Sequence, residues 1–207
     1  MIFKVYPAGI FQANCYIIGD KNSSFGAVID PGGDPEGILR ECESLGLNIK
    51  YIILTHGHGD HIGGVWDIKI KTGANILMHK GDEYLLKGGN SELMPILRNL
   101  KPFEVDKYIE QNQVIKLGEL EILIIETPGH TPGGVTLKIN DKLFTGDTLF
   151  RGSIGRTDFE FGSFEEIIHS INNRLMILGD DVIVYPGHGP STTIGYERRF
   201  NPFLNKE

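Results

Sequence analysis

The sequence has few of the features that stabilise secreted proteins or anchor proteins in membranes. Only two cysteines, Cys15 and Cys42, occur in 207 residues, and they form no Cys-x-x-Cys pair. This excludes a disulfide framework and a cysteine-rich structural zinc site, so we expect two reduced, partly buried thiols. The strongest apolar runs, residues 51–54 and 122–125, are far too short to cross a bilayer. Since no signal peptide is visible either, we expect a cytoplasmic protein.

The chain has fewer positively charged residues than negatively charged ones, and it is rich in glycine. The chain has 20 Lys and Arg against 27 Asp and Glu, which gives a formal net charge of −7. An acidic chain is a poor candidate for binding nucleic acid or an anionic membrane surface. Many of the 27 glycines stand beside histidine or aspartate. This placement indicates that backbone geometry around polar side chains matters in this protein.

Four β-prone segments each end in a turn that carries histidine or aspartate. These segments are residues 51–54, 121–126, 142–145 and 182–185. Helices are expected after Asp34, which is a suitable N-cap, and over residues 164–178, where Ser163 and Glu166 form a capping box. Because strand ends are where a rigid sheet can direct side chains into one crevice, the polar turns are candidates for a common site.

The densest group of candidate ligands is the segment His56-Gly57-His58-Gly59-Asp60-His61. In an extended chain His56 and His58 point the same way, because alternate residues share a face. Imidazole and carboxylate are standard ligands of zinc and related ions, and glycine lets the backbone fold tightly around them. Four such side chains this close together predict two metal ions. The alternative is a polar loop at a helix start, but such loops favour Ser, Asn and Asp over repeated His.

Three further candidate ligands follow the later segments, namely His130, Asp147 and His188. Each is weak alone, but together with the first motif they complete two ligand sets. One predicted set consists of His56, His58 and His130, and the other of Asp60, His61 and His188. Asp147 is predicted to bridge both metals, because one carboxylate has two oxygens to share. The other two histidines, His79 and His169, have no companion motif, and we expect structural roles for them.

At these residues the sequence resembles the metallo-β-lactamase-fold superfamily, over most of the chain. The matching stretches are His56 to His61, Pro128 to Gly133, Gly146-Asp147 and Gly187-His188. The ordered set is specific, although no single piece is. The resemblance implies an α/β fold, namely a four-layer αβ/βα sandwich of two mixed β-sheets with helices on the outer faces. It also implies a dinuclear metal site at one edge.

Within this superfamily the chain is similar to the glyoxalase II branch, which hydrolyses glutathione thioesters. Gly146 to Phe150 and Gly155-Arg156 carry this likeness, and Asp147 as a bridging ligand fits it, whereas true β-lactamases of this fold lack that aspartate. Asp158 stands where the branch has a tyrosine. The long glyoxalase II form has a C-terminal helical domain that contacts glutathione. Here we expect a single metallo-hydrolase domain over residues 1–207 without it.

The resemblance implies hydrolysis of a small thioester such as S-lactoylglutathione by a hydroxide that bridges two divalent ions. Zinc is the favoured metal, and iron or manganese also suit these ligands. Asp60 and Asp147 are the expected catalytic residues, with Asp60 orienting the hydroxide. Arg156 aligns with a basic residue that contacts glutathione in the family and is the candidate for binding a substrate carboxylate.

Three alternatives to thioester hydrolysis stay open at this level. Gly155 to Phe159 is also similar to persulfide dioxygenases, which use a single iron. His56, His130 and Asp147 would supply the two histidines and one carboxylate of such a site. The protein could instead hydrolyse another small ester or a lactone, or be a non-catalytic binding module that a metal stabilises.

Overall fold

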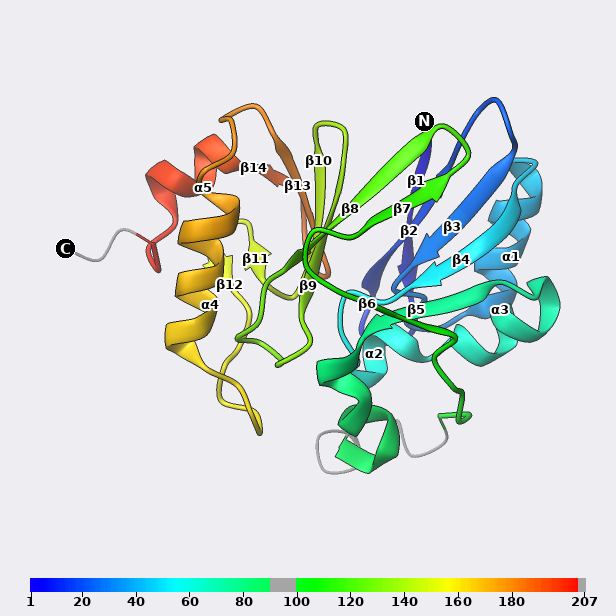
Figure 1. The fold of residues 1–207 in the computed structure, drawn as a ribbon, viewed down its shortest axis with the longest axis horizontal. Coiled ribbons are helices and arrows are strands. Elements are labelled where there is room, and N and C mark those ends of the chain that lie inside the picture. The colour runs from blue at the N-terminus through cyan, green and yellow to red at the C-terminus, as the bar shows by residue number, and fades with distance from the viewer. Residues whose placement is uncertain (90–99, 205–207) are drawn as a thin grey trace.

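Two six-stranded β-sheets lie face to face, with helices on their outer faces (Figure 1). The computed structural model describes residues 1–89 and 100–204. This arrangement is the predicted α/β sandwich of two mixed sheets. In the part of the chain that the structure describes, no helix is both long and apolar enough to cross a membrane.

The first sheet holds the N-terminal half of the chain. Its strands, in spatial order, are β1 (Ile2–Ala8), β2 (Ala13–Gly19), β3 (Phe25–Ile29), β4 (Asn48–Ile53), β5 (Asn75–His79) and β6 (Lys107–Ile109). The first three strands pair antiparallel, and β3 to β6 pair parallel. The outer face carries α1 (Pro35–Ser44) and α3 (Val65–Thr72), while the short α2 (Gly59–Ile62) follows β4 and the turns η1 (Lys80–Asp82) and η2 (Leu85–Gly89) follow β5.

The second sheet holds the C-terminal half. Its order is β14 (Thr192–Thr193), β13 (Ile183–Pro186), β10 (Lys142–Gly146), β9 (Val135–Ile139), β8 (Leu120–Glu126) and β7 (Val114–Leu117). Only the β10–β13 pair among these is parallel. The outer face carries α4 (Phe164–Ser170), its continuation η4 (Ile171–Leu175) and α5 (Ile194–Phe200), and a small hairpin joins β11 (Leu149–Phe150) to β12 (Ser153–Ile154).

Local sequence signals set the helix boundaries. Asp34 caps α1 by accepting a hydrogen bond from the Gly37 amide, with Pro35 at the first helical position, as predicted. Ser163 caps α4 by accepting from the Glu166 amide. The predicted single helix over 164–178 is wrong in its length, because the α-helical part ends at Ser170 and residues 171–175 form a wider π-type turn.

One layer of the hydrophobic core lies between the two sheets and contains a group of aromatic rings. Phe144 on β10 is fully buried there, with its ring centroid 5.0 Å from that of Tyr16 and 5.5 Å from that of Tyr185. Separate apolar layers lie between each sheet and its helices. Strand β4 contributes to both layers of its sheet, since Ile53 faces the other sheet and Ile52 the helices. This explains the continuous apolar run at 51–54.

Replacing Phe144 with alanine should destabilise the protein by about 3–5 kcal/mol, because it leaves a cavity between sheets that cannot close. The free energy of unfolding in urea, measured on metal-free protein, tests this. The control is Ile177→Ala, since Ile177 is 72% exposed and its truncation should change stability by less than about 0.5 kcal/mol. Equal effects of the two substitutions would contradict the assigned core.

Candidate metal centre

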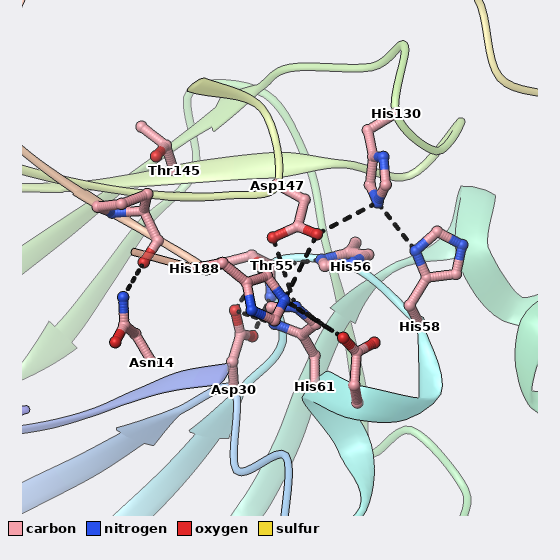
Figure 2. Close-up of polar contacts among 12 residues, drawn as sticks. Asn14, Asp30, Thr55, His56, His58, His61, His130, Thr145, Asp147 and His188 are labelled. Carbon is pink, nitrogen blue, oxygen red and sulfur yellow. Dashed lines mark hydrogen bonds and ion pairs between the residues drawn. The ribbon is translucent and has the colours of Figure 1, made fainter. Parts of the chain in front are cut away.

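All seven predicted ligands meet at one edge of the sandwich, although they come from both sheets (Figure 2). His56 and His58 follow β4, and Asp60 and His61 lie in α2 directly after them. The ligands from the second sheet follow strands β8, β10 and β13 and are His130, Asp147 and His188. The strand ends of two facing sheets therefore supply one cluster.

The first group consists of His56, His58 and His130, whose potential ligand atoms all lie within 4.8 Å of one another. His58 Nδ1 is 2.9 Å from His130 Nε2. The two rings meet nearly edge to face, with their centroids 4.7 Å apart. Three nitrogens this close together can bind one cation.

The second group consists of Asp60, His61 and His188, which satisfy the same 4.8 Å limit. His188 Nε2 is 3.2 Å from Asp60 Oδ2 and 3.2 Å from His61 Nε2. Both groups match those expected from the sequence. The structure also brings together a third group that the sequence did not predict, Asp30, His56 and His61, whose potential ligand atoms satisfy the same limit.

Asp147 lies between the two groups. Its Oδ1 is 3.4 Å from His61 Nε2, while its Oδ2 is 3.6 Å from His130 Nε2 and 3.8 Å from His188 Nε2. One oxygen therefore faces a member of the second group, and the other faces members of both. A carboxylate in this position can bind two cations at once.

Two polar atoms of the cluster have no hydrogen-bond partner. Among the residues that the structure describes, the buried side-chain nitrogen and oxygen atoms without a hydrogen-bond partner are His56 Nε2 and Asp147 Oδ1. A buried polar atom without a partner is costly, and native proteins rarely contain one. Because imidazole nitrogen and carboxylate oxygen are both good ligands of divalent cations, these atoms fit a metal centre.

The protonation states of His56, His58 and Asp147 suit metal binding, whereas His61 must first lose a proton. Burial alone would lower the pKa of His61, but the Asp147 and Asp30 carboxylates outweigh it and raise this pKa well above its usual value. Burial and the neighbouring His61 hold the pKa of His56 well below its usual value, and burial with the nearby His130 lowers the pKa of His58 to about 3. Both rings are therefore neutral at pH 7, with a lone pair available. Burial alone would raise the pKa of Asp147, but the adjacent His61 and the other histidines outweigh it and keep the carboxylate ionised.

Hydrogen bonds to the outer nitrogens orient three of the histidine rings. His61 Nδ1 lies 3.2 Å from Asp30 Oδ2, His130 Nδ1 lies 2.7 Å from the Arg156 carbonyl oxygen, and His56 Nδ1 lies 3.2 Å from Thr55 Oγ1. With Nδ1 engaged, each ring turns its Nε2 toward the cluster. Such outer partners fix the tautomer and the direction of metal-binding histidines.

Asp30 is a site residue that the sequence prediction missed. It is 1% exposed, and besides facing His61 it accepts hydrogen bonds from the Thr55 amide (2.7 Å) and the Thr55 hydroxyl (2.5 Å). By its composition the segment Asp30-Pro31-Gly32-Gly33 predicts only a turn. A usable signal was present, because Asp30 directly follows β3 and so repeats the pattern of a strand that ends in a carboxylate.

Two glycines leave room for the cluster where any side chain would collide with it. Gly146 has a φ of +49°, and a Cβ there would lie 2.2 Å from Thr55 Oγ1. A Cβ on Gly187 would lie 2.2 Å from Asp147 Oδ1. The sequence places glycine beside a candidate ligand at both positions for this steric reason.

A cavity of about 360 Å³ opens over the cluster. Apart from cluster residues, its lining consists of Phe150, Ser153, Ile154, Arg156 and Phe159. Arg156, the candidate for binding a substrate carboxylate, therefore lines the cavity beside the cluster. Its guanidinium is already engaged, since Nε and Nη2 donate to the two carboxylate oxygens of Asp158 at 2.9 and 2.8 Å.

The two histidines that were not predicted as ligands, His79 and His169, lie outside both ligand groups. His79 Nδ1 accepts a hydrogen bond from the Gly81 amide, and its Nε2 lies 3.2 Å from Glu126 Oε1. His169 Nδ1 lies 3.1 Å from the Asn173 side-chain nitrogen on the same helical segment. The His169 contact is local, whereas the His79 contact joins β5 of one sheet to β8 of the other.

Several known proteins are similar to this chain in sequence and in fold. Hydroxyacylglutathione hydrolase GloC of Haemophilus influenzae is 40% identical over 100% of both chains. The crystal structure of BLEG-1 B3 metallo-beta-lactamase superposes with a TM-score of 0.92 at 33% identity, covering 99% of this chain and 100% of that one. TTHA1623 in a di-iron-bound form gives a TM-score of 0.87 at 32% identity, covering 97% and 100%. The Metallo-beta-lactamase superfamily profile matches residues 8–188, and the chain belongs to that superfamily.

Proposed function

We propose that this protein is a dinuclear metal-dependent hydrolase that cleaves a small thioester, such as S-lactoylglutathione. The observation that carries the proposal is the carboxylate of Asp147 between two groups of three ligands, with its Oδ1 buried and without a hydrogen bond. The full-length similarity to a hydroxyacylglutathione hydrolase supports the choice of a thioester over other substrates of the superfamily.

In this proposal His56, His58 and His130 hold one cation, Asp60, His61 and His188 hold the other, and Asp147 holds both. Two divalent cations so held supply a water of lowered pKa and a Lewis acid for the substrate carbonyl. Zinc is the favoured metal. Iron is the second candidate, because a di-iron form of a structural neighbour is known.

Asp60 is the residue that we propose orients the attacking water. Its carboxylate lines the cavity, and its Oδ2 lies 3.2 Å from His188 Nε2. Burial would raise the pKa of Asp60, but the contact with His188 lowers it below the usual value, so Asp60 is ionised at neutral pH. An ionised carboxylate accepts a hydrogen bond from water and so aligns the water lone pair with the substrate carbonyl.

The cavity wall suits a thioester. Phe150, Ile154 and Phe159 supply apolar surface for the acyl chain and the thiol carbon atoms. The leaving thiolate needs little protonation, because a thiol has a pKa of roughly 8.5. A dedicated general acid is therefore unnecessary, and the cavity lining contains no lysine, cysteine or tyrosine among the described residues.

Arg156 is the proposed contact for a substrate carboxylate. Its guanidinium stacks over the Phe159 ring at 4.4 Å from the centroid, which holds it on the cavity wall. A substrate carboxylate must share this cation with Asp158, which already accepts two hydrogen bonds from it. We therefore propose that the carboxylates of the thiol part of the substrate contribute less to binding than they would if Arg156 had no ion pair with Asp158.

Purified protein should contain two divalent ions per chain and hydrolyse S-lactoylglutathione to lactate and glutathione. Chelation should abolish turnover, and readdition of zinc or iron should restore it, because the ligands can bind either metal. Metal analysis and thioester absorbance on one preparation test this. One iron per chain with oxygen uptake in the presence of a persulfide would support the dioxygenase alternative instead.

Replacing Asp147 with alanine should lower kcat/KM by more than about 100-fold, since loss of outer-sphere partners alone costs 10–100-fold. The number of metal ions retained after dialysis should fall at the same time. Asp141→Ala is the matched control, because Asp141 is an exposed aspartate in the turn before β10 and its loss removes the same charge. Full activity of the Asp147→Ala protein would rule out the bridging role.

Replacing Asp30 with asparagine should weaken metal binding about 10–100-fold, because His61 loses the carboxylate that orients its ring. High metal concentration should restore most of the activity, unlike in the Asp147→Ala protein. Metal competition with a chelator measures the affinity, and thermal unfolding of the metal-free protein reports any general loss of stability. An unchanged metal affinity would show that Asp30 serves the fold alone.

A further inference from the structure

A second buried carboxylate, Asp82, lies beside the metal centre without belonging to either ligand group. It is the last residue of η1 and is 0% exposed. Its Oδ2 accepts hydrogen bonds from the Gly57 amide at 2.9 Å and the Thr131 hydroxyl at 2.8 Å. Its Oδ1 accepts from the Gly133 amide at 2.6 Å. Three donors therefore satisfy this side chain.

The donors come from the two loops that carry the first ligand group. Gly57 stands between His56 and His58 in the loop after β4, and Thr131 follows His130 in the loop after β8. These strands belong to different sheets. One side chain thus ties the two halves of a ligand group whose closest nitrogens, His58 Nδ1 and His130 Nε2, are 2.9 Å apart.

Both loops pack closely against Asp82. A Cβ on Gly133 would lie 2.6 Å from both the amide nitrogen and the Oδ1 of Asp82. A Cβ on Gly57 would lie 3.2 Å from the Asp82 Cβ. Glycine at both positions therefore lets each loop donate its amide to the carboxylate at close range.

We propose that Asp82 is a positioning residue that sets the separation of His58 and His130 and so the affinity of the first ligand group for its metal ion. The inference rests on the proposed function in one respect, which is that this group binds a cation. Burying a carboxylate is expensive, and the cost is tolerated where the geometry it imposes is needed. Asp82 would act on one ion of the pair, because all its partners belong to loops of the first group.

The chain offers a matched control in Asp20. This aspartate is 5% exposed and accepts hydrogen bonds from the Ser23 amide, the Ser23 hydroxyl and the Glu119 amide. It also ties the two sheets together, since it lies in the β2–β3 turn and Glu119 lies in the β7–β8 turn. Asp20 precedes β3, whereas the metal centre lies at the other end of that strand. A purely structural link between sheets is thus available for comparison.

The experiment compares wild-type, Asp82→Asn and Asp20→Asn proteins. Each is stripped of metal and titrated with zinc in competition with a chelator, and thermal unfolding of the metal-free form is recorded. Asparagine keeps the shape but replaces one acceptor oxygen of the carboxylate with an NH2 group, which donates hydrogen bonds and cannot accept them. We expect Asp82→Asn to bind one of the two ions about 10–100-fold more weakly, with the other within a few-fold of wild type. Asp20→Asn should keep both affinities, even where its unfolding temperature falls.

The results of this experiment test the role of Asp82 separately from the proposed function. Wild-type affinity for both ions in Asp82→Asn overturns it, as does an equal loss at both ions. Wild-type protein that binds a single ion contradicts the dinuclear function, and the affinity of Asp82→Asn for that ion still decides the role of Asp82. If Asp82→Asn does not fold, Thr131→Val removes one donor and leaves both amide bonds. A several-fold loss at one ion then supports the proposal, and unchanged affinity overturns it.

Discussion

The carboxylate of Asp147 is the point on which the site depends. It stands between histidines from both sheets, and its two oxygens face different members of the two ligand groups. The two carboxylates packed among the histidines at this edge are costly to bury without compensating positive charge. Asp147 Oδ1 and His56 Nε2, which lack hydrogen bonds, show where a cation fits. The sandwich holds these groups together because its sheets are rigid and present their strand ends to one another.

A second layer of polar groups stabilises this arrangement. Asp30 orients His61, the Arg156 carbonyl orients His130, and Asp82 joins the loops on either side of the first group. These groups are buried or part of the backbone, so their geometry is set by packing and not by solvent. The ligand side chains are thus held in place before any metal binds, which limits the entropy that binding costs.

The cavity above the cluster explains how one fold serves different substrates. The superfamily includes structures named as a β-lactamase and a relative named as a hydroxyacylglutathione hydrolase, both similar to this chain along their whole length. The side chains that line the cavity are one place where such proteins can differ in substrate. In this chain they include Arg156, which pairs with Asp158, and residues of the β11–β12 hairpin.

The sequence by itself determined the identity of the seven clustered residues, their two groups, the four strands that lead to them and the starts of α1 and α4. It did so because a ligand motif such as His56 to His61 and a cap such as Asp34 are local patterns, and local patterns carry their own physical reason. Only the tertiary structure revealed Asp30 and Asp82, the engagement of Arg156 by Asp158, and the early end of α4 at Ser170. These features depend on contacts between residues far apart in the chain or on packing against the sheet. An isolated aspartate in a turn looks the same in sequence whether it faces solvent or a buried histidine.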